Sequence, residues 1–274
     1  MPRYSRPLGS LLNHKRSLSR GLLAAWTFQE RSAVTQAAKK YRSFGISRGV
    51  SLDWQSGNYD GWSISNIGLP AQQLASASTH RMHADSHHEW NRLSGDMSVS
   101  CWIRSANVST FQGVMGRREG SDSAAPWQFW LLSSKISFAV GEGGSSYAEA
   151  KQSDTMVNDT WAHICGVICG TDVKLYINGL PSGSDTFSGT RQTNTSVIRV
   201  GVYDNLNRFP FNGHYSMIKV WERGLCPAEV MTDYQDPWSP WRPSPMDKWR
   251  AAEQGGAPPV TGNRRRRLLI CGAA

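Results

Sequence analysis

The chain has 274 residues, of which 39% are hydrophobic and 19% charged, and this balance excludes a chain that stays disordered for lack of apolar residues. Taken alone, its formal net charge of +9 suggests a protein that binds nucleic acid. The charge is uneven, however: residues 1–20 hold five basic side chains and no acid, and residues 237–274 hold seven basic side chains and two acids. The intervening residues 21–236 are almost neutral, so we do not expect this body to bind nucleic acid.

The first apolar segment, residues 21–26, follows the basic leader and is predicted to be a strand. It is shorter than the apolar region of a signal peptide, roughly 7–15 residues. No stretch of the sequence reaches the roughly 20 apolar residues of a membrane helix. We therefore expect neither a secretory signal nor a transmembrane segment. Residues 33–41 are expected to form a short helix or a loop.

Apolar and polar residues alternate with a period of two through much of the middle of the chain, which is typical of half-buried strands. The strands predicted in this way cover residues 97–103, 127–131, 136–140, 163–169, 173–177, 198–202 and 216–220. Asn178-Gly179 follows one of them directly and indicates a tight hairpin in which both turn residues have positive φ. Pro227 begins a short helix that runs to about Tyr234. Many short strands with little helix predict a β-sandwich.

The sequence changes character after Asp236. Residues 237–245 are rich in proline and tryptophan, and proline cannot continue a sheet ladder. Residues 255–259 resemble a linker, and four arginines follow at 264–267. We therefore divide the chain into a basic N-terminal arm at 1–20, a folded domain at 21–236, and an extended Pro/Trp-rich tail with an arginine run at 237–274.

Five cysteines are present, and an odd number without a signal peptide argues against a disulfide framework. Cys165 and Cys169 belong to one predicted strand, where four residues span roughly 13 Å. A disulfide needs Cα atoms within roughly 7 Å, so these two cannot bridge to each other. We expect the cysteines to act mainly as small buried apolar residues.

The order of several motifs resembles a laminin-G-like domain of the concanavalin A-like lectin/glucanase superfamily, over about residues 21–236. The motifs are GLLAAWTF at 21–28, RMHADS at 81–86, GDMSVSCWI at 95–103, WAHI at 161–164, VKLYING at 173–179, IRVG at 198–201, FNG at 211–213 and VWERGLCPAEV at 220–230. Two positions depart from the family pattern: Cys226 replaces a usual serine cap, and Ala84 replaces a common proline. The resemblance implies an all-β fold, a concanavalin A-like jelly-roll sandwich of two antiparallel sheets. It also implies that the first and last strands are neighbours, so that both basic ends leave the same side.

The superfamily includes glucanases, so catalysis has to be considered. A retaining glycosidase needs two carboxyl groups about 5–5.5 Å apart. Glu142 and Glu149 flank a loop seven residues apart, and Asp85 and Glu89 belong to a turn, so no such pair is indicated. We expect no enzymatic activity. A histidine cluster is interpreted as a polar surface loop rather than a zinc site, and it comprises His80, His83, His87 and His88.

The resemblance leaves one cofactor open, because many domains of this kind bind calcium through loop oxygens at the rim of the sandwich. Asp85 and Asp204 are the candidate ligands. We otherwise expect no cofactor.

Lectin-like sites place aromatic rings against sugars and use polar groups to fix the hydroxyls. The candidate ligand-binding residues are aromatic or amide side chains of loops and strand ends: Trp127, Trp130, Tyr147, Tyr203, Asn205 and Asn207. Because the two tryptophans point to opposite strand faces, at most one of them belongs to the core.

The ends of the chain supply the residues that we expect to anchor it to partners. These are basic or aromatic: Arg3, Arg6, Lys15, Arg16, Arg20, Trp238, Trp241, Arg242, Trp249, Arg264, Arg265, Arg266 and Arg267. Three functions remain open at this point. The first is a non-enzymatic structural or adhesion module, a multicopy or homo-oligomeric surface component of a bacteriophage virion that contacts other virion proteins and cell-surface glycans. The second is a free carbohydrate-binding lectin, and the third is a glycoside hydrolase.

Overall fold

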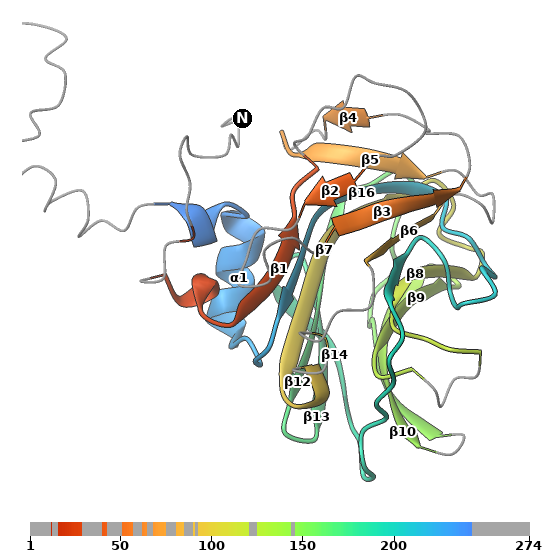
Figure 1. The fold of residues 1–274 in the computed structure, drawn as a ribbon, viewed down its shortest axis with the longest axis vertical. Coiled ribbons are helices and arrows are strands. Elements are labelled where there is room, and N and C mark those ends of the chain that lie inside the picture. The colour runs from red at the N-terminus through yellow and green to blue at the C-terminus, as the bar shows by residue number, and fades with distance from the viewer. Residues whose placement is uncertain are drawn as a thin grey trace, which may run out of the picture.

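The computed structural model describes residues 12, 16–28, 40–42, 51–56, 62–64, 68–74, 81–84, 90, 93–120, 125–143 and 146–242. These residues form two antiparallel sheets packed face to face (Figure 1). The arrangement confirms the predicted jelly-roll sandwich.

The first sheet, sheet A, has eight strands among the described residues. Seven of them lie in the order β14-β13-β12-β7-β16-β5-β4, and β1 pairs with β16 beside this path. Their bounds are β1 Leu22–Trp26, β4 Trp62–Ile64, β5 Pro70–Leu74, β7 Met97–Ser105, β12 Ala162–Cys169, β13 Asp172–Ile177, β14 Leu180–Thr186 and β16 Gly213–Trp221. The pairing of β1 with β16 places the start and the end of the sandwich side by side, as the resemblance implies.

The second sheet, sheet B, also has eight strands among the described residues, in the order β11-β10-β9-β8-β15-β6-β3-β2. Their bounds are β2 Lys40–Arg42, β3 Ser51–Ser56, β6 Arg81–Ala84, β8 Gln112–Gly116, β9 Gln128–Leu132, β10 Lys135–Gly143, β11 Ser146–Lys151 and β15 Ile198–Val200. Each strand predicted from the alternation therefore exists, with ends shifted by a few residues.

The core lies between the sheets and is made by the alternating apolar residues. In β7, Met97, Val99, Cys101 and Ile103 all belong to this cluster and are fully buried. Gly166 on β12 is needed there, because a Cβ atom at this position would lie 2.6 Å from the ring of Phe138 on the opposite sheet. The two sheets are therefore in close contact across the core.

Local signals in the sequence explain the connections. Asn178 and Gly179 have φ of 51° and 80°, so the hairpin between β13 and β14 has two turn residues with positive φ, as predicted. The predicted helix is α1, Pro227–Gln235, with its proline in the first turn. The expectation of a helix or loop over 33–41 is wrong at its C-terminal end, because Lys40–Arg42 forms β2 and pairs with β3. The rest of that segment lies outside the described residues.

The outer face of sheet A is covered by α1 and two single-turn 3-10 helices, η1 at Ser17–Ser19 and η4 at Ser239–Trp241 (Figure 1). Trp238 and Trp241 are buried here, beside Leu18 and Trp221. Trp221 Nε1 donates to Leu18 O at 2.8 Å, and Ser19 Oγ donates to Pro240 O at 3.0 Å. The described parts of the arm and the tail thus pack on the sandwich and on each other.

A buried ion pair joins α1 to the same face. Asp233 accepts hydrogen bonds from Lys219 Nζ, from His163 Nε2 at 3.1 Å and from Ser100 Oγ at 2.7 Å. All four side chains are almost completely buried. Tyr234, the next residue of α1, stacks on Trp102 with ring centroids 5.4 Å apart. The helix is therefore held by both charge and ring packing.

Candidate functional site

Five aromatic side chains gather on the outer side of sheet B, and we call them the aromatic face: Phe111, Trp130, Tyr147, Tyr203 and Phe209. The strand period explains part of the set. Phe129 and Leu131 of β9 belong to the core, so Trp130 between them points outward. Tyr147 on β11 is exposed, whereas Ala148 belongs to the core.

The rings of the aromatic face contact one another edge to face. The centroid of Trp130 lies 5.8 Å from that of Tyr147 and 6.2 Å from that of Tyr203. Phe111 lies 4.7 Å from Tyr203 and 4.6 Å from Phe209. These separations are in the range of favourable aromatic pairs, so the rings support each other in fixed orientations.

A glycine allows the loop after β15 to reach the face. A Cβ atom at Gly113 would lie 2.1 Å from the backbone nitrogen of Tyr203, so the β8 backbone can approach the loop only without a side chain. Gln128 Nε2 also donates to Tyr203 O. Tyr203 is therefore positioned from two strands of sheet B.

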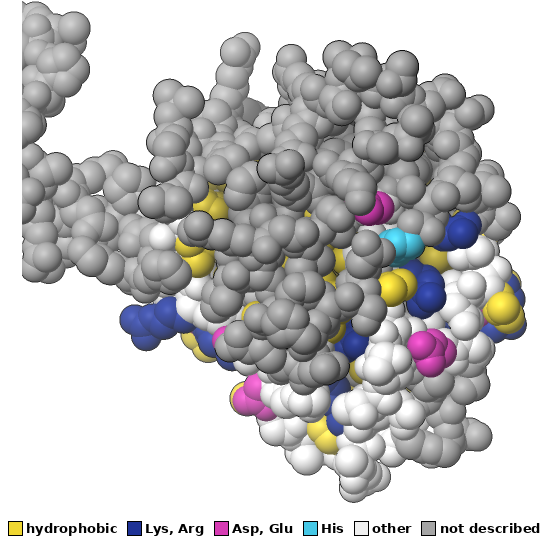
Figure 2. Space-filling model, viewed as in Figure 1, with side chains coloured by type: hydrophobic (Ala, Val, Ile, Leu, Met, Phe, Trp, Pro, Cys, Tyr) yellow, Lys and Arg dark blue, Asp and Glu magenta, His cyan; other side chains and the backbone are white. Residues whose placement is uncertain are grey.

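Polar groups line one edge of the aromatic face. The guanidinium of Arg118 lies 4.1 Å from the ring centroid of Tyr203 and donates to Gln128 Oε1 at 3.1 Å. Asn205 is exposed beside it, and its Oδ1 accepts from Gly120 N at 3.1 Å. Figure 2 shows hydrophobic side chains beside basic ones at the outer end of the loop that joins β15 to β16.

The structure brings together four of the six predicted ligand-binding residues: Trp130, Tyr147, Tyr203 and Asn205. Trp127 does not belong to the aromatic face, because its side chain is fully buried in the core between the sheets. Asn207 has a φ of 61° and is half-buried, so it shapes the loop. As expected, only one of the two tryptophans faces outward.

Phe111, Phe209 and Arg118 were missed by the sequence analysis. Phe209 lies in the loop between two strands, where no alternation indicates a direction for the side chain. Phe111 and Arg118 flank β8, and only the pairing of β8 with β15 brings them to Tyr203. No local signal in the sequence could have found them.

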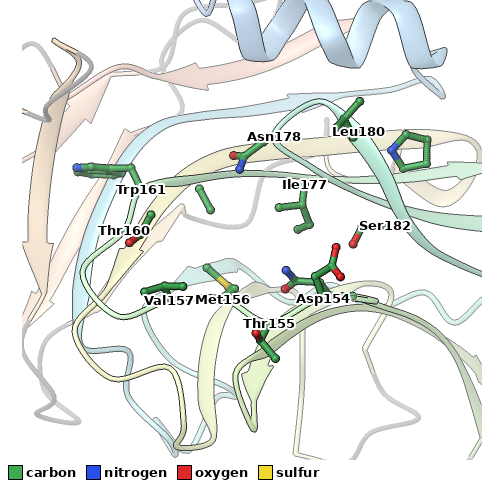
Figure 3. A pocket seen from close by; sticks show the side chains of 13 residues that line it. Asp154, Thr155, Met156, Val157, Thr160, Trp161, Ile177, Asn178, Leu180 and Ser182 are labelled. Carbon is green, nitrogen blue, oxygen red and sulfur yellow. The ribbon is translucent and has the colours of Figure 1, made fainter.

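A pocket of about 380 Å³ lies where the segment between β11 and β12 meets the β13–β14 hairpin (Figure 3). We call it the rim pocket. Met156, Ile177 and Leu180 form apolar walls, and the carboxylate of Asp154 and the hydroxyl of Ser182 lie near each other (Figure 3). The pocket suits a small ligand with an apolar body and a polar group.

Of the two calcium candidates, Asp85 lies outside the described residues. Asp204 is fully buried, and its carboxylate accepts from Leu206 N at 3.0 Å and Arg208 N at 3.2 Å and pairs with the Arg208 side chain. A cation would have to displace that guanidinium. Within the described ranges, no three His, Cys, Asp or Glu side chains are placed to hold a metal ion. Of the histidine cluster, His83 belongs to β6, and the other three members lie outside the described residues.

The anchoring residues at the described ends contact the chain itself. Arg16 Nε donates to Arg242 O at 3.4 Å, and the Arg242 guanidinium lies 3.1 Å from Asp236. Arg20 accepts a hydrogen bond at its carbonyl from Arg223 Nε. Trp238 and Trp241 are buried, so they stabilise the fold rather than offer surface to a partner. The other predicted anchors lie outside the described residues: Arg3, Arg6, Lys15, Trp249, Arg264, Arg265, Arg266 and Arg267. In the described part of the chain, no helix has the length and apolar character to cross a membrane.

Comparison with known proteins adds a family and a set of similar folds. A family model described as the concanavalin A-like lectin/glucanases superfamily matches residues 77–231. No curated protein sequence matches the chain.

Several solved structures have a similar fold. The binding domain of Paraclostridial Mosquitocidal Protein 1 has a TM-score of 0.61 and 16% identity, over 79% of this chain and 52% of that one. The binding domain of Botulinum neurotoxin serotype D has a TM-score of 0.58 and 14% identity, over 78% and 50%. That of serotype G has a TM-score of 0.57 and 11% identity, over 78% and 50%. The chain therefore spans about half the length of these structures, and at such identities the likeness concerns the fold alone.

Proposed function

The chain belongs to the concanavalin A-like lectin/glucanases superfamily, and from this premise we propose that it is a non-enzymatic binding module whose aromatic face holds a saccharide. The family name covers both sugar-binding and sugar-cleaving proteins, so features of this chain have to separate the two. The three similar structures described above are binding domains, which supports the first alternative.

The open aromatic face is the observation that carries the proposal. Tyr147 and Phe209 expose 41% and 43% of their surface. The rings of Trp130 and Tyr203 lie between these two and pack against them. Rings that are already packed present apolar surface to the C–H face of a sugar without losing much conformational freedom on binding. Asn205, in the same loop as Tyr203 and Phe209, is exposed and carries an amide group that can bond a sugar hydroxyl.

Two carboxyl groups of α1 have pKa values shifted away from the range of a catalytic acid. A glycosidase needs a carboxylic acid whose pKa is raised so that it can donate a proton. In the described ranges, the pKa values of Glu229 and Asp233 are lowered instead. Burial would raise the pKa of Glu229, but its ion pair with Arg223 outweighs this and lowers it. Burial would likewise raise the pKa of Asp233, but Lys219 and His163 hold it well below its usual range.

The position of the described ends of the chain supports attachment to a larger assembly. Both described ends lie on the outer face of sheet A, whereas the aromatic face lies on the outer side of sheet B. Each flanking segment also carries a net charge of +5, by count of its basic and acidic residues. A module attached through these segments would present the aromatic face away from its support. We propose that this support is a bacteriophage virion, with the module present in several copies.

Binding of the full chain to a glycan array tests the saccharide proposal. Tyr147→Ala should weaken binding about 5- to 30-fold, because it removes one exposed ring worth about 1–2 kcal/mol. Asp154→Ala, in the rim pocket, is the matched control and should bind like the wild type. Loss of binding in the control alone would move the site to the rim pocket. Absence of any glycan binding by the wild type would refute the proposal, and release of sugar products would show hydrolysis instead.

Attachment is tested separately. Sedimentation of the full chain should show species larger than a monomer, and a chain limited to residues 16–242 should lose them. Mass spectrometry of density-purified virions should detect the protein. A monomer in both preparations, together with absence from virions, would contradict the proposed assembly but leave glycan binding unaffected.

A further inference from the structure

Two arginines are buried near the end of the sandwich where β8 meets the segment before β15. Arg117 is 4% exposed, and its guanidinium donates to Ser196 O at 3.0 Å, Trp90 O at 3.0 Å and Asn194 O at 2.8 Å. Arg191 is 8% exposed and donates to Gly95 O and to Pro126 O, the latter at 3.3 Å. Backbone carbonyls thus satisfy hydrogen bonds of both groups but do not cancel their charge.

Neither guanidinium forms an ion pair with a carboxylate in the described part of the chain. The nearby acids are engaged elsewhere: Glu119 accepts from Ser196 Oγ at 2.7 Å, and Asp96 accepts from Gly170 N at 2.8 Å. Buried arginines are rare without an acidic partner, because removing a cation from water costs several kcal/mol. Both cations are therefore buried without a directly paired carboxylate, and Glu119 and Asp96 act on them only from a distance.

The ionisation of the two arginines agrees with this geometry. Burial lowers the pKa of Arg117 to about 10, although Glu119 opposes the change. Burial also lowers the pKa of Arg191 to about 10; the positive charge of Arg117 adds to the effect, and the carboxylate of Asp96 opposes it. The charge of Arg117 therefore disfavours the charge of Arg191. An anion bound beside the two guanidinium groups would relieve this repulsion.

A pocket of about 260 Å³ opens directly onto Arg117, and we call it the arginine pocket. Pro126, whose carbonyl accepts from Arg191, also lines it, so Arg191 lies behind the wall that Arg117 helps to form. Ser94 and Thr193 are exposed at the pocket and carry hydroxyl groups. No acidic side chain is among its described lining residues, which are Trp90, Leu93, Ser94, Arg117, Pro126, Gln192, Thr193 and Asn194.

From this arrangement we propose that the arginine pocket binds an oxyanion, a carboxylate or sulfate group carried by an acidic saccharide. A guanidinium has five N–H donors, and Arg117 uses three of them on carbonyls, so two remain for an oxyanion. The hydroxyls of Ser94 and Thr193 add further donors. The saccharide as the source of the anion rests on the proposed function, whereas the preference for an oxyanion rests on the buried charge alone.

Thermal unfolding of the full chain tests the pocket, with methyl glucuronide and glucose 6-sulfate as the probes and methyl glucoside as the neutral control, all at one ionic strength set with chloride. Either anionic sugar at about ten times its Kd should raise Tm by about 3–5 °C. The two anionic sugars show whether a carboxylate or a sulfate is preferred. An equal shift with the neutral sugar, or no shift with either anion, would overturn the proposal.

Variants at the mouth of the pocket make the test specific. Thr193→Asp places a carboxylate near Arg117, so it should raise Tm without ligand and remove the shift caused by glucuronide. Thr193→Asn has nearly the same shape without the charge and should do neither. A persistent glucuronide shift in Thr193→Asp would refute the site.

The aromatic face and the arginine pocket can be separated. Tyr147→Ala should lose array binding but keep the glucuronide shift, because Tyr147 does not line the arginine pocket. If the wild type shows the shift but no array binding, the oxyanion site stands and the proposed function fails. If array binding is lost only in Tyr147→Ala and no anion changes Tm, the proposed function stands and the oxyanion site fails.

Discussion

Replacing Asp233 by alanine should destabilise the protein strongly, because it leaves a buried cation without a partner. Lys219 and Asp233 have side chains that are each 1% exposed, and they form an ion pair. Removing one member of a buried pair costs about 3–5 kcal/mol, mostly from the unpaired charge that remains. Ser100 and His163 would also lose the carboxylate that accepts their hydrogen bonds.

Urea unfolding followed by tryptophan fluorescence measures this cost, and thermal unfolding gives a second readout. For a chain of this size, about 3–5 kcal/mol corresponds to a decrease in Tm of roughly 6–20 °C. The matched control is Asp172→Ala, which removes an exposed pair with Lys174 at 2.8 Å and should cost less than about 1 kcal/mol.

A second change separates charge from packing. Adding Lys219→Met to Asp233→Ala removes the orphaned cation, so the double variant should recover part of the lost free energy of unfolding. If Asp233→Ala costs no more than the exposed control, the ion pair does not hold α1 on the sheet. If the double variant loses as much free energy of unfolding as the two single variants added together, the unpaired charge is not the cause of the destabilisation.

Three further changes follow from the same structure. Gly166→Ala should cost about 1–3 kcal/mol in urea unfolding, because its Cβ would overlap the ring of Phe138, whereas Gly95→Ala should be tolerated since nothing lies within 4 Å of a Cβ there. Trp238→Ala should cost about 3–5 kcal/mol and speed proteolytic cleavage of the tail; unchanged cleavage would contradict its role in holding that segment. The pKa of Asp233 is depressed in the fold, so its contribution to stability is complete above the unfolded value near pH 4 and is lost as the pH falls below it. Urea titrations between about pH 5 and 2 should therefore show a smaller loss of stability in Asp233→Asn than in the wild type, and equal slopes would refute the assignment.

The strands were predictable because each has one face on the core. In β9 the core residues Phe129 and Leu131 alternate with outward residues, so period two is visible in the sequence. The turn at Asn178-Gly179 was predictable for a local reason, since positive φ at two successive positions favours that pair.

The covering of the outer face of sheet A was not predictable from the same pattern. Ser98, Ser100 and Trp102 on β7 alternate with core residues and therefore suggest a solvated face, yet all three are buried. They are covered because α1 and η4 dock from the C-terminal part of the chain and η1 docks from the N-terminal part. Contacts between segments about 100 to 200 residues apart leave no periodic signal.

The candidate site shows the same division. Trp130 and Tyr147 could be predicted to face outward, because each lies on a strand with a regular pattern. Tyr203 and Phe209 come from a loop whose path depends on the close approach of Gly113. Trp127 is in phase with the core residues Phe129 and Leu131, so the same alternation places it in the core and Trp130 outside.

The adjacent exits of the chain determine how the module carries mechanical load. A force applied between the segment before Arg16 and the segment after Arg242 acts on the contacts between η1 and η4 and then on the pairing of β1 with β16. It does not cross the strands that support the aromatic face, β8 to β11. Tension along the chain would therefore peel the first strand from the last before it deformed the binding surface.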